Sequence, residues 1–327
     1  MKALALFSGG LDSSLAVKVI KEQGIEVIGL NFVSYFFGGE NERSEKAAKE
    51  LGIQLEYIDF KERHRLMMLN PVCGYGKNMN PCIDCHGLMI KIAYENLEKY
   101  GANFIITGEV LGQRPMSQNR IALKRVDKLS GTTGYVVRPL SGQLMEETIP
   151  EKMGWISREK LLNFNGRNRT PQIELAKKYN LVHYPSPGGG CLLTEPNYSK
   201  RLKIIKDDNN FHKDYLFYLA KNTRMYKLNT GKYIFVGRDE ESNQELSKYK
   251  EYGSIYITTH KVPGPYIIGI GDFEENDITF AKELFSRYSK IKGECEIEMN
   301  YNGEVIKIGI IDKNKLENMM KELQIVN

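Results

Sequence analysis

The chain begins with a short apolar run that leads into a glycine turn and then into a helical pattern. Residues 3–7 are apolar, residues 8–14 read Ser-Gly-Gly-Leu-Asp-Ser-Ser, and residues 15–20 continue as a mostly apolar helical segment. A strand, a glycine turn and a helix start in this order direct unpaired backbone N–H groups and the positive end of a helix dipole at one point. The segment therefore predicts a site that binds a nucleotide through its phosphates.

The loop lacks the lysine of the commoner phosphate-binding pattern, G-x-x-x-x-G-K-[ST]. It carries Asp12 instead. A carboxylate beside phosphates makes chemical sense where it holds Mg²⁺ or orients a ligand. The whole string resembles the signature of the ATP pyrophosphatase (PP-loop) superfamily, and this resemblance implies cleavage of ATP between its α and β phosphates. An ordinary turn after a strand is the alternative interpretation.

Length and composition favour a multidomain protein of the cytosol. A chain of 327 residues that is 41% hydrophobic can form two or three cores. Because the first strand pattern starts at residue 3, we expect no signal peptide, and no apolar run approaches the roughly 20 residues of a membrane span. We therefore expect a cytoplasmic protein that does not bind membranes.

The positive charge is concentrated in the middle of the sequence. Residues 150–232 carry 16 Lys and Arg against 7 Asp and Glu, a balance of +9, whereas residues 1–149 balance at +1 and residues 233–327 at −5. Phosphate neutralisation supplies most nucleic-acid affinity, so this distribution favours an RNA partner. A solvated basic face without a partner is the alternative.

Residues 1–149 show the alternation of a parallel α/β domain. Strand patterns at 3–7, 27–32, 54–59 and 104–107 are separated by helical patterns, which predicts a doubly wound parallel sheet. Ligands of such sheets lie at the carboxyl ends of the strands. The expected nucleotide-binding residues are Ser8, Gly9, Gly10, Asp12, Ser13, Ser14, Asn31, Phe32, Thr107, Gly108 and Gln113.

The end of this domain is followed by two further regions. Residues 120–149 read as extended pieces and turns, and residues 150–209 read as a basic helical region, including the Cys191 loop, that is expected to contact RNA. Its expected RNA contacts are Arg167, Arg169, Lys200 and Arg201. Residues 210–327 carry five strand patterns, one helical pattern and an Asn-Gly hairpin turn at 302–303, which predicts an α+β domain.

The cysteines predict metal or sulfur chemistry rather than a disulfide framework, because five is an odd number in a large chain without a secretion signal. Cys82 and Cys85 are spaced i, i+3 at a predicted helix start, where the helix dipole lowers a thiol pKa. Cys191 follows a glycine-rich stretch that permits close approach to another site. Cys295 alternates with apolar residues and reads as a core residue.

Three thiolates could hold a [4Fe-4S] cluster with one open iron, or a zinc ion completed by His86 or Cys73. A metal-free alternative uses Cys85 and Cys191 as a persulfide donor and a resolving thiol. Purely structural cysteines are the simplest alternative.

Together these segments resemble tRNA-thiolating enzymes. Residues 8–14, 107–113 and 138–140 resemble the PP-loop domain of tRNA 4-thiouridine synthetases, and residues 80–85 resemble the catalytic stretch of tRNA 2-thiouridylases. The resemblance covers about residues 1–195. It implies an ATP-dependent tRNA sulfurtransferase that adenylates a uridine carbonyl and replaces its oxygen with sulfur from sulfide or a sulfur-donor protein. The implied cofactors are ATP, Mg²⁺ and a [4Fe-4S] cluster, and the implied catalytic residues are Asp12, Cys82, Cys85 and Cys191.

The chain departs from both families. We expect neither the RNA-binding extension before the PP-loop nor a rhodanese-like domain after it. Residues 260–266 and 281–290 instead resemble the RNA-binding module of NFACT-type proteins, for which a stabilising β-rich domain is the alternative. Two rival functions use the same loop: a PP-loop ligase that makes amides or amidines, and a non-catalytic RNA-binding protein regulated by a nucleotide.

Overall fold

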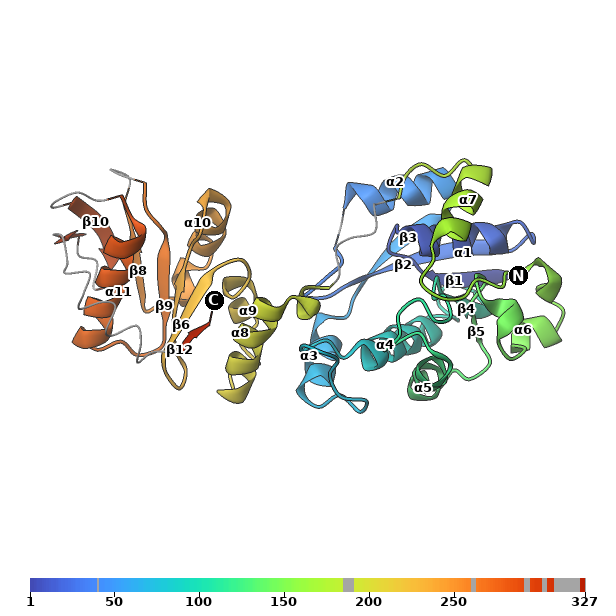
Figure 1. Ribbon diagram of the computed structural model, residues 1–327, viewed down its shortest axis with the longest axis horizontal. Coiled ribbons are helices and arrows are strands. Elements are labelled where there is room, and N and C mark those ends of the chain that lie inside the picture. Colours follow the sequence, from blue (N-terminus) through green and yellow to red (C-terminus); the bar gives the residue numbers. More distant parts are fainter. Residues whose placement is uncertain are drawn as a thin grey trace. The chain divides into compact units, whose positions relative to one another are not determined.

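The computed structural model describes residues 1–39, 41–184, 191–259, 263–290, 295–301, 305–308 and 324–326. The chain forms two compact units, Met1–Cys191 and Leu192–Asn327 (Figure 1). This division differs from the predicted boundaries, because the basic region 150–209 is shared between the units. Ile156 and Ala176 are buried in the core of the first unit, whereas the buried Tyr198 donates a hydrogen bond to the Phe217 carbonyl in the second.

The first unit is built on a five-stranded parallel sheet. Its order is β3-β2-β1-β4-β5. The strands are β1 (Lys2–Leu6), β2 (Glu26–Val33), β3 (Gln54–Asp59), β4 (Phe104–Ile106) and β5 (Val136–Val137). Four of them coincide with the strand patterns in the sequence to within a residue at either end, so the predicted α/β fold is confirmed.

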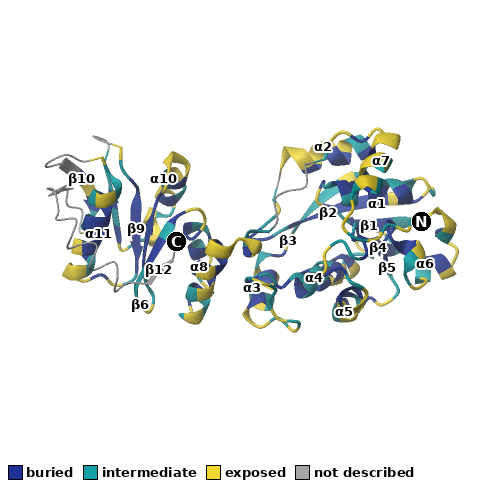
Figure 2. Ribbon diagram, in the orientation of Figure 1, coloured by how far each residue is buried: buried dark blue, intermediate teal, exposed yellow. Residues whose placement is uncertain are grey.

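Helices cover both faces of this sheet (Figure 1). One face carries α1 (Leu11–Lys21), α2 (Glu42–Leu51) and α7 (Thr170–Lys178), and the other carries α3 (Lys61–Leu69), α4 (Cys82–Glu95) and α5 (Arg120–Ser130). Shorter helices are η1 (Gly142–Leu144), α6 (Ile149–Lys152) and η2 (Arg158–Lys160). Alternate strand residues supply two cores: Ala3 and Ala5 lie in one and Leu4 in the other. The central strands are accordingly buried on both sides (Figure 2).

Helix α5 corrects the prediction of extended structure after residue 120. The Asn119 side chain accepts a hydrogen bond from the Ala122 N–H at the start of the helix, and Gly131 ends it with a φ of 70°. Ala122, Leu123 and Val126 bury one face. These cap residues and this spacing are ordinary helix signals that the sequence carried.

A buried histidine lies among aromatic rings on the face of the sheet opposite α1. His64 of α3 stacks on Phe60 with ring centroids 5.0 Å apart. Its Nδ1 lies 2.7 Å from the Ser34 hydroxyl, and its Nε2 is buried without a partner. Burial lowers the pKa of His64 from its ordinary value of 6.5 to about 4. The folded protein therefore keeps this side chain neutral.

This burial predicts acid sensitivity of the first unit. Between pH 6.5 and about 4 the unfolded chain protonates His64 while the folded chain does not, so stability falls as the pH falls through that window. From pH 7 to pH 5 we expect His64 to remove about 2 kcal/mol from the free energy of unfolding. Urea titrations followed by fluorescence of Trp155, the single tryptophan, report this unit. The variant His64→Leu should lose that part of the pH dependence, and an unchanged slope would contradict the assignment.

The second unit is a seven-stranded antiparallel sheet with helices packed on it. The order is β11-β10-β8-β9-β7-β6-β12. The strands are β6 (Arg224–Asn229), β7 (Lys232–Val236), β8 (Ile255–Thr258), β9 (Ile267–Ile270), β10 (Cys295–Asn300), β11 (Val305–Ile308) and β12 (Gln324–Val326). The helices are η3 (Leu192–Thr194), α8 (Pro196–Asp207), α9 (Tyr215–Leu219), α10 (Glu240–Ser247), η4 (Lys250–Tyr252) and α11 (Glu275–Tyr288).

Apolar residues of α11 form the core of this unit against the sheet. Ile278, Leu284 and Phe285 pack with Ile234 and Ile257. The predicted α+β domain is thereby confirmed, although β6 and α10 were not predicted. The predicted hairpin turn at 302–303, residues 260–262 of the NFACT-like segment and the glycine-rich stretch 186–190 lie outside the described residues, as does the side chain of Cys295. In the described part of the chain, no helix is long and apolar enough to span a membrane.

Candidate active site

The loop after β1 enters its helix earlier than the sequence pattern indicated. Helix α1 starts at Leu11 with Gly10 as its N-cap, so Asp12, Ser13 and Ser14 lie in the first turn. The Ser14 N–H bonds to the Gly10 carbonyl at 3.0 Å, which leaves the preceding N–H groups without an acceptor inside the helix. Gly9 has a φ of +70°, and a Cβ there would lie 2.8 Å from the Ser44 Cα. The turn therefore requires glycine and presents donors to an anion.

The loop after β4 packs directly on this turn. A Cβ on Gly108 would lie 2.6 Å from the Ser13 backbone nitrogen. Gln113 donates from Nε2 to Asp12 Oδ2 at 2.9 Å. Strands β1 and β4 are neighbours at the point where the winding of the sheet reverses, which is where ligands of such folds bind. The structure thus brings Gly108 and Gln113 together with Asp12.

Two polar atoms of this turn are buried without a hydrogen-bond partner. They are Asp12 Oδ1 and Ser14 Oγ. A buried polar atom without a partner costs about 1–3 kcal/mol, more when it is charged, so such atoms point to a ligand or ion that completes them. A carboxylate oxygen and a hydroxyl oxygen are suitable ligands for Mg²⁺ and its phosphates.

Three other predicted nucleotide residues lie at the same edge with different roles. Asn31 is buried near the end of β2. The Phe32 ring packs against Phe60 in the core beneath α4, because successive strand residues face opposite sides, so only its backbone lies at this edge. Thr107 is buried and donates its hydroxyl to Glu109 Oε2 at 3.1 Å.

The predicted RNA contacts divide into exposed and buried residues. Arg167 and Lys200 are exposed. Arg169 instead lies beside the nucleotide loop, with Nη2 3.6 Å from Asp12 Oδ2. Arg201 is only 3% exposed, so a direct RNA contact by its side chain is not supported. It lies on the inward face of α8, where burial and then Arg238 lower its pKa.

The two paired cysteines lie in the first turns of α4. Cys82 is the first residue of the helix, and its sulfur accepts a hydrogen bond from Asn80 Nδ2 at 3.3 Å. Cys85 is 7% exposed. Burial raises the pKa of the Cys85 thiol well above its usual range, and Cys191, Cys82 and Asp84 raise it further. The expected lowering of the pKa is therefore wrong for Cys85, because desolvation outweighs the helix dipole.

The same interactions show that Cys85, Cys82 and Cys191 lie within electrostatic reach of one another. The structure therefore brings together the cysteines that the sequence separates by about a hundred residues. Cys73, Cys82, Cys85 and Cys191 form no disulfide. Among the residues that the structure describes, no three His, Cys, Asp or Glu side chains are grouped closely enough to hold a metal ion.

A buried charge network links the cysteine helix to the loop after β4. Arg138 Nε donates to Glu109 Oε2 at 2.9 Å, and the two Nη atoms of Arg138 donate to Asp127 at 2.8 and 3.0 Å. His86 Nδ1 lies 2.9 Å from Glu109 Oε1. Burial alone would raise the pKa of Glu109, but Arg138 and His86 outweigh it and lower that pKa to about 2.

Sequence reasoning missed the role of Glu109. The signal was its place in a Thr-Gly-Glu segment directly after a buried strand. Because Glu109 holds His86, and His86 follows Cys85, the loop after β4 contacts the nucleotide turn with one part and the cysteine helix with another.

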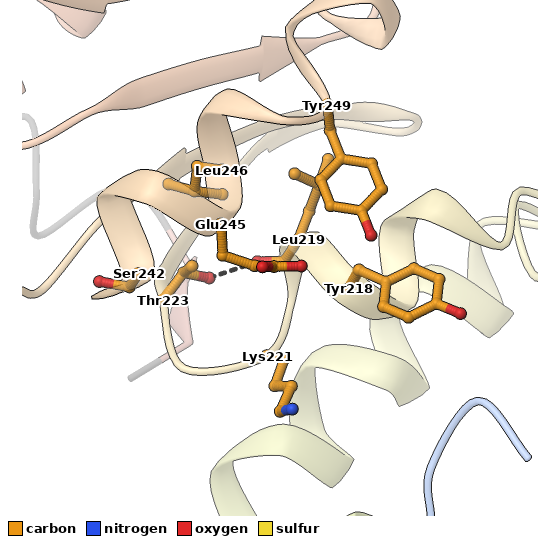
Figure 3. A pocket seen from close by; sticks show the side chains of 8 residues that line it. All are labelled: Tyr218, Leu219, Lys221, Thr223, Ser242, Glu245, Leu246 and Tyr249. Atoms are coloured by element: carbon orange, nitrogen blue, oxygen red, sulfur yellow. Dashed lines mark hydrogen bonds between the residues drawn. The ribbon is translucent and has the colours of Figure 1, made fainter. Parts of the chain in front are cut away.

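The second unit has a shallow recess between α9 and α10 (Figure 3). It is lined by Tyr218, Leu219, Lys221, Thr223, Ser242, Glu245, Leu246 and Tyr249. The Thr223 hydroxyl is used within the wall, where it donates to the Leu219 carbonyl at 2.6 Å. The recess is a shallow surface depression with no enclosed room for even a water-sized molecule, so it is not a ligand pocket.

Each of the two units contains a segment that matches a known protein family. Residues 1–151 match the family described as thiamine biosynthesis protein (ThiI). Residues 224–320 match the NFACT protein RNA binding domain.

Two individual relatives carry names of tRNA-thiolating enzymes. The chain is 25% identical to a tRNA-specific 2-thiouridylase MnmA 2 of Fusobacterium nucleatum subsp. nucleatum, over 93% of this chain and 92% of that protein. It is 32% identical to a probable tRNA sulfurtransferase of Thermococcus kodakarensis, over 45% of this chain and 39% of that protein.

A solved structure of a 4-thiouridine synthetase–RNA complex with bound ATP aligns at 21% identity and a TM-score of 0.40, over 66% of this chain and 53% of that chain. Taken together, residues 1–151 are similar to ThiI and the whole chain is similar to tRNA-specific 2-thiouridylases, while residues 224–320 are similar to the NFACT RNA binding domain.

Proposed function

We propose that this protein is an ATP-dependent tRNA sulfurtransferase that adenylates a uridine carbonyl oxygen and replaces it with sulfur. One observation carries the proposal: the loop after β4 contacts both the nucleotide turn, through Gln113 and Asp12, and the cysteine helix, through Glu109 and His86. Activation and sulfur transfer must occur in succession on the same carbonyl group of the substrate. An arrangement that supports both chemistries from one loop suits this sequence of steps.

The first step would use the nucleotide turn. The uridine oxygen attacks the α phosphorus of ATP, a P–O bond forms, and the bond to pyrophosphate breaks. The N–H groups of the first turn of α1 and the Ser14 hydroxyl would bind the leaving pyrophosphate. Asp12 would hold Mg²⁺ through its unpaired Oδ1, which neutralises charge on the phosphates. In the second step sulfur adds to the activated carbon, and AMP leaves with the original oxygen.

We propose that Cys82, Cys85 and Cys191 would hold a [4Fe-4S] cluster. Thiolates are suitable ligands for such a cluster, and the three cysteines lie within electrostatic reach of one another, although binding would require them to come closer together than the structure places them. Ligation would offset the burial and the neighbouring charges that raise the pKa of Cys85. A cluster bound by three thiolates would supply sulfide at its open iron. Burial raises the pKa of a free Cys85 thiol, and this works against the persulfide alternative, because sulfur attack requires a thiolate. Zinc is the other metal that this donor set accepts.

The RNA partner is proposed from charge and from the family matches. Arg167 and Lys200 are exposed in a region with a balance of +9, and residues 224–320 match an RNA binding domain. We propose that these parts bind tRNA and that the enzyme acts in the cytosol. An amidating ligase would not use the three cysteines in its reaction. A non-catalytic RNA-binding protein would not need a carboxylate oxygen such as Asp12 Oδ1 to hold Mg²⁺ at the phosphates.

The proposal predicts a specific set of products. Protein purified without oxygen and mixed with MgATP, sulfide and bulk tRNA should release pyrophosphate and AMP and form thiouridine, measured by nucleoside chromatography. Iron and sulfide analysis should find about four of each per chain. Pyrophosphate without thiouridine would favour the amidating ligase, and no pyrophosphate would favour the binding protein. Colourless protein that contains zinc would contradict the cluster.

A further inference from the structure

We infer that Arg169 binds the phosphates of the nucleotide and that Asp12 is its counter-charge in the cradle. This inference rests on the proposed function, because it requires ATP at the turn after β1. It replaces the expectation that Arg169 contacts RNA. It also assigns the start of α7, about 155 residues further along the chain, to the same site as the PP-loop signature.

Packing of α7 along α1 fixes this position. At one end of the pair, Arg169 Nη2 lies 3.6 Å from Asp12 Oδ2. At the other end, the Tyr179 hydroxyl donates to Glu22 Oε2 at 2.8 Å, and Lys18 lies over the Tyr179 ring. The two helices therefore run in the same direction, and both start at the carboxyl edge of the sheet (Figure 1). Two positive helix ends and a guanidinium thus converge on one region.

The segment before α7 is also tied to the loop after β4. The Gly166 N–H donates to the Leu111 carbonyl at 2.7 Å. Gly112 has a φ of +77°, and a Cβ there would lie 2.8 Å from Asn165 Oδ1. This close backbone contact leaves little freedom for the residues that carry Arg169. Packing against the loop after β4 therefore constrains the position of Arg169.

Arg169 and Asp12 pair poorly with each other. A separation of 3.6 Å is an ion pair without a good hydrogen bond, since charge-assisted N–H···O bonds lie near 2.7–2.9 Å. Arg169 Nε and Asp12 Oδ1 are both buried and have no partner at all. A half-buried cation and a half-buried anion, each with one buried atom that has no partner, suit a third group that offers both charges. A magnesium-bound polyphosphate does so, with oxygens for the guanidinium and a cation for the carboxylate.

Gln172 supports this arrangement from the first turn of α7. It is 0% exposed, and its Nε2 donates at 3.4 Å to Oε1 of Gln113, which in turn donates to Asp12. Gln172 Oε1 has no partner. We assign Gln113 and Gln172 as positioning residues, because their contacts orient the Asp12 carboxylate that faces Arg169.

The test compares ligands with and without phosphates. Binding of ATP and of adenosine is measured by calorimetry, with and without Mg²⁺, for the full chain and for Arg169→Ala, Arg169→Lys and the control Lys178→Ala. Lys178 is exposed at the far end of the same helix, and its replacement by alanine removes one positive charge, as Arg169→Ala does. We expect Arg169→Ala to weaken ATP binding about ten- to hundredfold and to leave adenosine binding unchanged. Arg169→Lys should retain part of the affinity, and Lys178→Ala should retain it all.

Each other outcome decides between the roles. Equal ATP affinity in Arg169→Ala and the unaltered chain would overturn the inference while pyrophosphate release by the unaltered chain still supported the proposed function. Equal losses for ATP and adenosine would show a structural role and overturn it as well. If Arg169→Ala weakened binding of tRNA but not of ATP, Arg169 would be an RNA contact and the inference would be overturned. An unaltered chain that binds no ATP would overturn both proposals. Trp155 fluorescence confirms folding, and Arg169→Lys keeps the test valid if the alanine variant does not fold.

Discussion

Replacement of Asp12 by asparagine is expected to lower pyrophosphate release by at least about a hundredfold while the fold is retained. Asparagine has the same shape, and its side-chain oxygen can still accept the hydrogen bond that Gln113 donates at 2.9 Å. It removes the negative charge at Oδ1, which is buried and has no other partner in the protein. The loss should therefore fall on binding of the magnesium nucleotide and not on stability.

The measurement is pyrophosphate release in a single turnover with ATP and tRNA, together with a urea titration followed by Trp155. The matched control is Glu26→Gln, which removes an exposed carboxylate at the opposite edge of the sheet, where Glu26 pairs with Lys2. That control should release pyrophosphate at the unaltered rate. Normal turnover by Asp12→Asn would overturn the assignment of the cradle.

Replacement of Cys85 by serine is expected to separate the two chemical steps. Thiouridine formation should fall by at least about a thousandfold, because sulfur transfer loses a thiol that lies with Cys82 and Cys191. Pyrophosphate release in the first turnover should persist, since Cys85 packs in the core on the face of the sheet opposite α1. Serine is close in size, so the buried position in α4 should remain packed.

Cys82→Ser and Cys191→Ser should give the same split, with loss of iron in each if the three thiols hold a cluster. Cys295→Ser, in β10 of the second unit, is the matched control and should thiolate normally. Full thiolation by all three variants would exclude sulfur chemistry at these cysteines and favour the amidating ligase. Loss of pyrophosphate release in Cys85→Ser would place that thiol in the activation step.

Much of the first unit was readable from local sequence. Buried parallel strands form short continuous apolar runs, and turns and caps separate them, so β1 to β4 were predicted almost to the residue. The glycine turn at residues 8–14 could be predicted as a phosphate-binding site because its backbone geometry requires particular residues at consecutive positions. Helix α5 was missed although Asn119 and Gly131 mark its ends, because its short apolar face was read as extended structure.

The sequence by itself determined where the phosphate turn lies, which residues supply Asp12 and the cysteines, and that a basic region follows. Only the tertiary structure decided that Arg169 faces Asp12, that Arg201 is buried, and that burial raises the pKa of Cys85. The reason is physical. Periodicity and turn chemistry act between residues that are close along the chain, whereas these three outcomes depend on packing against distant elements. Such packing sets burial and distance, and these decide charge.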